Sequence, residues 1–327
     1  MSNDIPVPAA EPINYRSDNT ARTIHLAIFA SLAVALAIAP FVLYPIFVMK
    51  VMCFALFTCS FNLLFGYGGM LSFGHAAFFG TGSYFCAYFA KKHGLPTELA
   101  LSLGTLAATL LSVIGGLLAI RRQGIYFAMI TLATAQMIFF IAVQTPYAGG
   151  EDGIQSVPRG KLFGQFDLAN TMTLYVTIAV LFIAALLAYY RIIHSPFGRV
   201  LRAIRDSETR AISLGYNVNR YKLMLFVLSG TLAGLAGAMK CIVFQLASLT
   251  DVHWSLSGEV VIMTLVGGLG TIFGPVVGAL ILVGMQNYLA TFGDWVMIIQ
   301  GLVLFACVMT FRKGILGVIA SRLKLRL

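Results

Sequence analysis

The sequence predicts an all-α, polytopic integral membrane protein with about ten membrane segments. Its 327 residues are 59% hydrophobic and only 10% charged, whereas soluble domains carry about 25% charged residues. The apolar residues gather in runs of about 20, the length that an α-helix needs to cross a bilayer. No charged stretch is long enough for a separate soluble core. We therefore expect one membrane domain, 23–312, between a cytoplasmic tail, 1–22, and a basic cytoplasmic tail, 313–327.

Ten apolar segments follow one another along the chain. The eighth is too short to cross alone, so we expect a half-helix or re-entrant segment that protein or a cavity shields. The first contains Ala35-Leu36-Ala37, which resembles a signal-peptidase site, but the tail before it is long and contains acidic residues, so we expect this segment to be retained. The segments are 24–43, 46–65, 72–90, 97–120, 124–144, 171–192, 221–247, 257–268, 273–290 and 295–311.

Basic residues predict the orientation. With the N-terminus inside, sixteen Lys and Arg residues fall on the cytoplasmic side and five on the outside. Because cytoplasmic loops of membrane proteins carry the excess of Lys and Arg, this asymmetry predicts that both termini are inside (N-in, C-in). The net charge of +10 then belongs to loops at the membrane surface and indicates no nucleic-acid partner. The five outer residues are Lys50, Lys91, Lys92, Arg159 and Lys161.

Metal and catalytic motifs are missing from the sequence. The five cysteines lie in apolar segments without a CxxC pair, so they are expected to be packing residues. The histidines are scattered and predict no metal site. No nucleophile elbow, HExxH or paired-aspartate motif occurs. We therefore expect a protein that is not an enzyme and that carries no metal or cofactor of its own.

Glycine interrupts the apolar sequence twice. Gly66-Tyr67-Gly68-Gly69 breaks a helix and predicts an irregular turn that lines a cavity or a subunit interface. From Ser72 onward, small residues recur at steps of three and four residues, as in closely packed membrane helices. The stretch 265–279 again has a double glycine, here Gly267-Gly268, followed by small residues. Paired Gly-interrupted segments of transporters tend to mark the substrate path, although a chance match of two glycine-rich segments is an equal alternative.

Four of the polar or charged residues within apolar segments are candidates for pairing or function, because such residues are costly there. His75 is expected to bond a neighbouring helix, with a pore or gate role as the alternative. Gln136 is expected to form a hydrogen bond between helices. Lys240 and Glu259 are expected to form an ion pair. The predicted translocation path comprises Gly68, Gly69, Ser72, His75, Gln136, Glu259, Gly267 and Gly268.

The longest inner loop, 194–222, predicts two short helices. Ser195 and Pro196 are typical of a helix start, and Gly215 is typical of a helix end. Between them, polar residues lie on one face of the predicted helix and apolar residues lie on the other. Such a helix either lies on anionic lipid or docks into another protein, and composition alone favours the lipid.

Five ordered motifs resemble a known family. They are "FNLLFGYGGMLSFGHAAFFG", "QGIYFAMITLATAQM", "GGEDGI", "SPFGRVLRAIRDSETRAISLGYNV" and "VVIMTLVGGLGTIFGPVVGA". Together they resemble the membrane permease subunit of bacterial branched-chain amino-acid ABC importers, over about residues 50–312. Gln123 stands where the family usually has a small or basic residue, and Arg210 replaces an alanine of the family pattern.

The resemblance implies a complex in the bacterial cytoplasmic membrane. Its partners would be a homologous second permease, two cytoplasmic ATPase subunits and a periplasmic binding protein. The chain has no GxxxxGK[ST] loop, so the ATP would be bound by the partner subunits. Glu151 and Asp152 lie in an outer loop and could receive the binding protein. The loop 194–222 resembles the family's ATPase-coupling segment, which favours docking over lipid and assigns coupling to Arg199, Arg202, Arg205, Asp206, Glu208, Ala211 and Gly215.

Two functional alternatives stay open. Permeases of the same family carry urea, other amino acids or small aromatic acids, so the resemblance leaves the substrate open. A secondary transporter driven by an ion gradient would need carboxylates or histidines at mid-membrane. Only Glu259 and His75 qualify for that role, and the sequence gives neither an evident relay partner.

Overall fold

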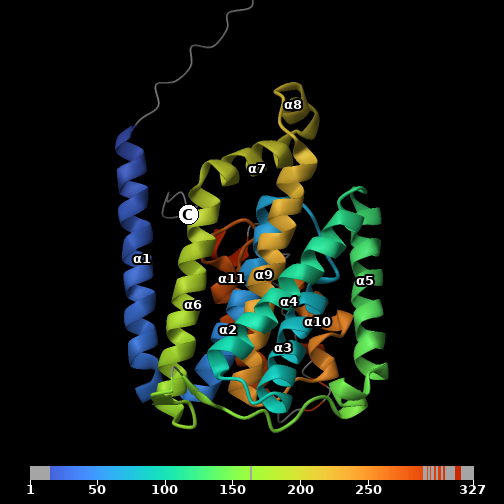
Figure 1. Ribbon diagram of the computed structural model, residues 1–327. Coiled ribbons are helices and arrows are strands. Elements are labelled where there is room, and N and C mark those ends of the chain that lie inside the picture. Colours follow the sequence, from blue (N-terminus) through green and yellow to red (C-terminus); the bar gives the residue numbers. More distant parts are fainter. Residues whose placement is uncertain are drawn as a thin grey trace, which may run out of the picture.

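The computed structural model describes residues 15–162 and 164–289, and beyond them only 293, 295, 298–299, 301–302, 305 and 314–317. The described chain is a helical bundle (Figure 1), which confirms an all-α polytopic membrane protein. The tenth expected segment, 295–311, lies mostly outside the described residues, as do the tail 1–14, Cys307 and most of 313–327.

The long helices begin and end close to the expected limits. Among the described residues, five are long and apolar enough to span a membrane: α2 with the π-helical turn η1 (Pro45–Tyr67), α4, α5, α6 and α9. The first expected segment, 24–43, differs most, because α1 begins nine residues earlier, at Tyr15. The third begins three residues late, at His75, because 68–74 is irregular. The helices are α1 (Tyr15–Val42), α2 (Pro45–Asn62), α3 (His75–Lys92), α4 (Thr97–Ala119), α5 (Ile125–Gln144), α6 (Thr171–His194), α7 (Pro196–Asp206), α8 (Glu208–Ser213), α9 (Val218–Phe244), α10 (Trp254–Gly267) and α11 (Gly274–Tyr288).

Helices α2, α3, α4 and α9 form the centre of the bundle, where α9 contacts the other three. Small residues allow this contact. A Cβ at Gly82 would collide with the Gly234 backbone, and one at Gly237 with the carbonyl of Phe79. Membrane helices associate through such close backbone approach, because apolar contact alone gains little in lipid. The small-residue pattern after Ser72 is thus a packing face.

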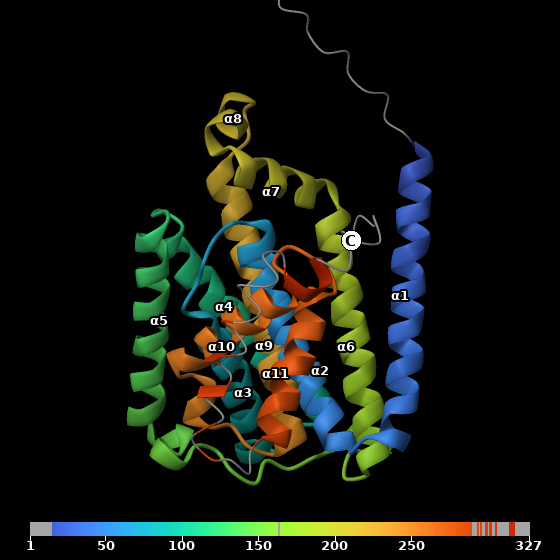
Figure 2. The same cartoon turned by 180° about the vertical axis from the view of Figure 1, so that it is seen from behind.

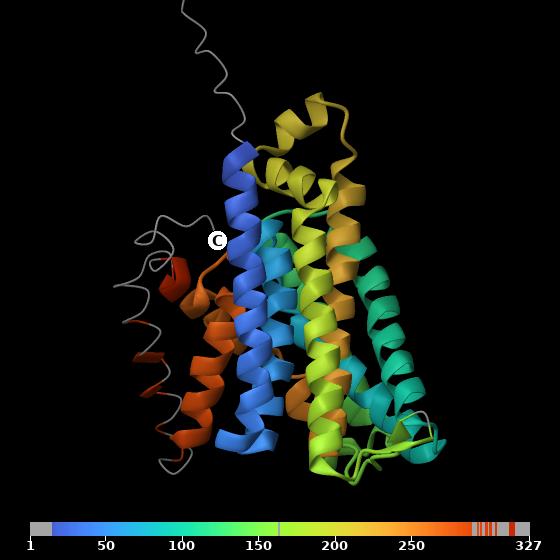
Figure 3. The same cartoon turned by 90° about the vertical axis from the view of Figure 1, so that its left-hand side faces the viewer.

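The two sides of the bundle differ in character. α4, α5 and α6 expose many large apolar side chains, among them Leu110, Phe140 and Val180 at about 60% exposure. Such a surface suits lipid contact. α10 and α11 lie on the opposite side from α4 (Figures 2 and 3). α10 has 14 residues, about 21 Å of helix at about 1.5 Å per residue, and is therefore shorter than a bilayer core, as expected for the eighth segment.

The two ends of the bundle carry different connections. α7 and α8 lie at one end, where α1 also begins, and the segment between α5 and α6 lies at the other (Figure 1). That segment contains the 3₁₀ turns η2 (Pro146–Ala148) and η3 (Gly150–Asp152) and the antiparallel strands β1 (Lys161–Leu162) and β2 (Phe166–Asp167). Ile154 pairs with Ala247, and the Arg159 guanidinium donates to the carbonyls of Ile242 and Val243, so this segment is fixed to the end of α9.

Candidate functional site: paired glycine turns beneath a lever helix

The two glycine-rich turns that the sequence shows 200 residues apart lie side by side. Asn62, the last residue of α2, joins them: its amide nitrogen donates to the carbonyl of Thr271 at 2.8 Å, and its oxygen accepts from the backbone N–H of Gly270 at 2.9 Å. The same nitrogen donates to the hydroxyl of Tyr189 on α6, also at 2.8 Å. A Cβ at Gly66 would collide with both Asn62 and the Gly270 nitrogen. Glycine is thus required at this contact.

Arg205 lies on α7 (Pro196–Asp206), which we call the lever helix, and it connects this helix to the pair of turns. Its guanidinium donates to the carbonyl of Gly66, and its Nη1 lies 3.7 Å from the position a Cβ would take on Gly270. The Arg205 stem lies against Gly69, whose φ of +69° favours glycine. One side chain from the helix at the end of the bundle therefore reaches both turns.

A cavity of about 640 Å³ opens between these elements. It brings together residues of the expected path and residues of the expected coupling segment: Gly68 and Gly69 from the first turn with Arg205, Asp206 and Glu208 from α7 and α8. The expected irregular turn is met in part: Gly66 and Tyr67 continue the helix as the π-helical turn η1, and Gly68 and Gly69 are irregular and line the cavity. The remaining lining residues are Met70, Leu71, Phe73, Arg122, Gln123, Gly124, Ile125, Phe127, Ala128, Ile204, Ser207 and Lys222.

The carboxylate of Glu208 is bound by two side chains of this same chain. Its carboxylate lies 2.7 Å from the ammonium of Lys222 on α9 and accepts a 3.0 Å hydrogen bond from the side-chain amide of Gln123 before α5. Lys222 is only 8% exposed, so Glu208 balances a nearly buried charge. Gln123, the departure from the family pattern, thus fixes the same carboxylate.

The α7–α8 pair is built as the sequence predicts. The Ser195 hydroxyl accepts from the Gly198 N–H at the start of α7, with Pro196 in the first turn. α8 ends before Gly215, whose φ is +86°. Ala211 is buried with Ile204 and Val218 and joins the two short helices to α9. Arg199, Arg202 and Asp206 are exposed on α7, free to meet another surface.

His75 lies in the helix-packed core. Its Nε2 is 2.9 Å from the Ser229 hydroxyl, which itself donates to the carbonyl of Ser60 at 2.5 Å. Because that proton goes to Ser60, Ser229 accepts from His75, which places the imidazole proton on Nε2. The ring is fully buried among Phe57, Phe61 and Phe78. The expected bond to a neighbouring helix is confirmed, and His75 does not line the cavity.

The expected ion pair between Lys240 and Glu259 is wrong. The Lys240 ammonium lies 2.7 Å from the carboxylate of Asp251, in the 3₁₀ turn η4 (Leu249–Asp251). Asp251 sits 11 residues after Lys240, where the chain turns back from α9, and the sequence alone does not show that this turn places it beside the amine. Glu259 instead accepts a 3.1 Å hydrogen bond from the side-chain amide of Gln286 on α11.

The other expected path residues are spread over the bundle. Ser72 is buried, and its hydroxyl accepts from the Gly74 N–H. The expected hydrogen bond from Gln136 to another helix is wrong, because its half-buried side chain makes no hydrogen bond among the described residues. Gly267 and Gly268 form the closely packed turn between α10 and α11, where a Cβ at Gly267 would collide with the Gly274 carbonyl. Glu151 and Asp152 are exposed in η3 at the end opposite α7. In the part of the chain that is described, no group of three His, Cys, Asp or Glu residues could hold a metal ion.

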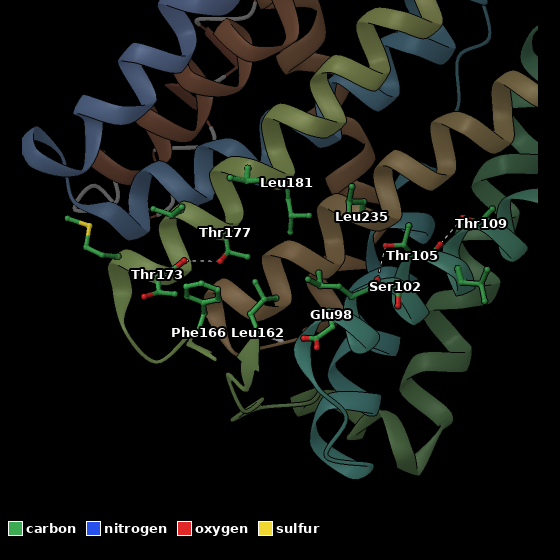
Figure 4. A pocket seen from close by; sticks show the side chains of 15 residues that line it. Glu98, Ser102, Thr105, Thr109, Leu162, Phe166, Thr173, Thr177, Leu181 and Leu235 are labelled. Atoms are coloured by element: carbon green, nitrogen blue, oxygen red, sulfur yellow. Dashed lines mark hydrogen bonds between the residues drawn. The ribbon is translucent and has the colours of Figure 1, made fainter. Parts of the chain in front are cut away.

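A second, larger groove of about 930 Å³ runs between α4 and α6, with Leu235 of α9 among its lining residues (Figure 4). Its hydroxyl groups are used within the helices: Ser102, Thr105 and Thr109 each donate to a carbonyl of α4, and Thr177 donates to one of α6. Glu98 and Thr173 also line the groove, and the rest of its wall is apolar and belongs to the side that suits lipid. None of the expected path residues lines it, and we do not assign the polar site there.

The structure is thus an apolar helical bundle with glycine-rich turns inside it and α7 across one end. Residues 43–308 match the family described as "branched-chain amino acid transport system / permease component". The chain belongs to this family, and the resemblance to permease subunits of ABC importers is confirmed. It is a multi-pass protein of the bacterial inner membrane.

The similar proteins are named as permeases of several kinds. The high-affinity branched-chain amino acid transport system permease protein LivM of Escherichia coli is 25% identical over 81% of this chain and 68% of its own length. The ribose import permease protein RbsC of Escherichia coli is 29% identical over 46% of this chain and 50% of its own. The fructose import permease protein FrcC of Rhizobium meliloti is 25% identical over 67% and 64%. No solved structure matches the chain.

Proposed function

We propose that this chain is the permease subunit of an ATP-driven importer, in which α7 and α8 carry movement of an ATPase partner to the paired glycine turns. The observation behind the proposal is the hydrogen bond from Arg205 to the Gly66 carbonyl. A side chain of the lever helix thereby contacts the π-helical turn η1, and its stem lies against Gly69 in the irregular segment that follows. Irregular backbone at membrane depth is tolerated only where protein or a cavity covers it, and its bonds are easier to rearrange than those of a helix.

The exposed side of α7 and α8 is the proposed ATPase contact, with Arg199 and Arg202 exposed on α7 and Asp206 exposed at the edge of the cavity. Arg205, Glu208, Ala211 and Gly215 position the two helices on the membrane domain. ATP is bound by the partner subunits, because this chain has no phosphate-binding loop. The remaining partners are a homologous second permease and a periplasmic binding protein that docks near Glu151 and Asp152. This arrangement requires ten membrane segments with both termini on the cytoplasmic side.

Branched-chain or related amino acids are the proposed substrates. The match to LivM covers 81% of this chain, whereas the match to the ribose permease of the same species covers 46%, and this difference favours amino acids over sugars. Urea or a small aromatic acid remains the alternative within the family. The proposed path runs past Gly68 and Gly69 at the inner cavity, with Ser72, His75, Gly267 and Gly268 shaping the helices behind it and Gln136 and Glu259 beside it.

Reconstitution in liposomes distinguishes an ATP-driven importer from a transporter driven by an ion gradient. The chain is co-expressed with its neighbouring permease and ATPase genes, purified and placed in liposomes with the binding protein outside. We expect leucine uptake that requires ATP inside and that persists when proton and sodium gradients are dissipated. Uptake that follows a gradient without ATP would refute the proposal.

A further inference from the structure

Three polar side chains meet near the outer end of the bundle, in a place the importer function leaves unexplained. Lys50 lies on the second turn of α2, Glu259 on the second turn of α10, and Gln286 at the end of α11. The three helices pack against one another. α2 and α10 begin at the end opposite α7, and α11 ends there (Figure 2). All three residues are half-buried. The cluster therefore lies one to two helical turns below the outer surface.

Contacts within the cluster are specific but incomplete. Glu259 accepts from Gln286 at 3.1 Å. One turn before Lys50, the ring of Phe47 contacts that of Tyr288 with centroids 5.9 Å apart, which turns this face of α2 toward the end of α11. Within the described residues, Lys50 and Glu259 form no direct ion pair. Two opposite charges thus face one region and do not neutralise each other by contact.

Charges at membrane depth are rare because lipid cannot solvate them, and they usually mark a substrate path. The cluster lies on the α10–α11 side of the bundle, away from α4. Lys240 is already paired with Asp251 and is not available. Among the described residues on this side, Lys50 and Glu259 are opposite charges without a direct ion-pair partner.

We propose that Lys50, Glu259 and Gln286 form an outer binding site for the zwitterionic head of an α-amino acid. The Lys50 ammonium takes the α-carboxylate, and the Glu259 carboxylate, oriented by Gln286, takes the α-ammonium. A sugar carries no charges to satisfy this pair, so the site selects an amino acid over a neutral substrate by leaving buried charges unpaired when the wrong molecule enters. The site deepens the proposed importer function and rests on it.

The test uses photo-leucine, a zwitterionic amino acid with a light-activated diazirine, in the reconstituted importer. Its ATP-dependent uptake and its crosslinks to peptides of α2, α10 and α11 are measured together. The variants are Lys50→Gln and Glu259→Gln. Lys161→Gln is the matched control, since it removes an exposed outer charge in β1. Lys50→Arg and Glu259→Asp preserve charge and report whether the fold tolerates change at these positions.

We expect photo-leucine to label these helices in the parent, and both uptake and labelling to fall at least about tenfold in the two neutral variants. The control and the charge-preserving variants should stay within about twofold of the parent. Parent-like uptake and labelling in both neutral variants would overturn the site. So would a loss of assembled importer, by size exclusion, that fully accounts for the lost uptake. A parent that imports ribose but not photo-leucine with ATP would overturn the site and leave the importer function intact.

Discussion

The ammonium of Lys240, on α9, lies 2.7 Å from the carboxylate of Asp251, in the turn that leads to α10. The same carboxylate oxygen accepts from the Ser83 hydroxyl and from the Ser248 N–H. Both charged residues are less than a tenth exposed. The pair therefore joins α3, α9 and the start of the α10–α11 hairpin near the end of the bundle opposite α7.

Neutralising one partner of this pair should destabilise the protein strongly. Lys240→Met or Asp251→Asn leaves an uncompensated buried charge, at a cost of about 3–5 kcal/mol, and the double variant should recover much of it. Thermal unfolding in detergent measures the three proteins. Lys240→Met combined with Glu259→Gln is the matched comparison and should be additive. Coupling of Lys240 to Glu259 rather than to Asp251 would contradict the structure.

Asn62→Ala should loosen the contact between the two glycine turns. It removes three hydrogen bonds and leaves the half-buried Gly270 N–H and Thr271 carbonyl without this partner, so we expect a loss of up to about 1–3 kcal/mol for each group left unsatisfied. The midpoint of thermal unfolding should drop clearly. Ser102→Ala, which deletes a hydroxyl bonded only to its own helix, should unfold close to the parent; an equal shift in both variants would argue against a special role for Asn62.

Glu208→Ala should uncouple ATP hydrolysis from uptake while the permease still reaches the membrane. The change frees Lys222 and Gln123 and releases α8 from α9 and from the start of α5. A carboxylate on anionic lipid would instead be slightly repelled, so its loss would leave uptake equal or better. ATPase and uptake rates of the reconstituted variant decide whether α7 and α8 dock on an ATPase or lie on anionic lipid. Asp167→Asn, in the β1–β2 hairpin, is the control.

Sidedness follows from the charge asymmetry and from the two ends of the bundle. A cysteine at position 150, in η3, should react with a membrane-impermeant maleimide added to the periplasmic side of a cysteine-free background. A cysteine at position 207, between α7 and α8, should react only after the membrane is permeabilised. The opposite pattern of labelling would reverse the orientation and with it the assignment of α7 and α8 to the ATPase side.

Local features of this fold could be predicted and long-range pairings could not. The length of the apolar runs predicted the membrane helices. Ser195, Pro196 and Gly215 predicted where α7 begins and α8 ends, because helix caps depend on neighbours in sequence. Asn62 carried no signal, since an amide in an apolar helix does not reveal which turn it will bond. Asp251 was overlooked as the partner of Lys240 because it lies in a turn rather than in a span.

Arg205 is the residue on which the proposed coupling depends most directly. Its bond to the Gly66 carbonyl is the contact between the lever helix and the glycine turns, and losing a hydrogen bond to a charged group costs about 1.5–3 kcal/mol. Arg121→Ala removes an exposed arginine near the same end and is the control. The decisive measurement is the number of leucine molecules imported per ATP hydrolysed in liposomes that hold equal amounts of each assembled importer. We predict a ratio at least about tenfold lower in Arg205→Ala, with continued ATP hydrolysis, and an unchanged ratio in Arg121→Ala. An unchanged ratio in Arg205→Ala would contradict the account.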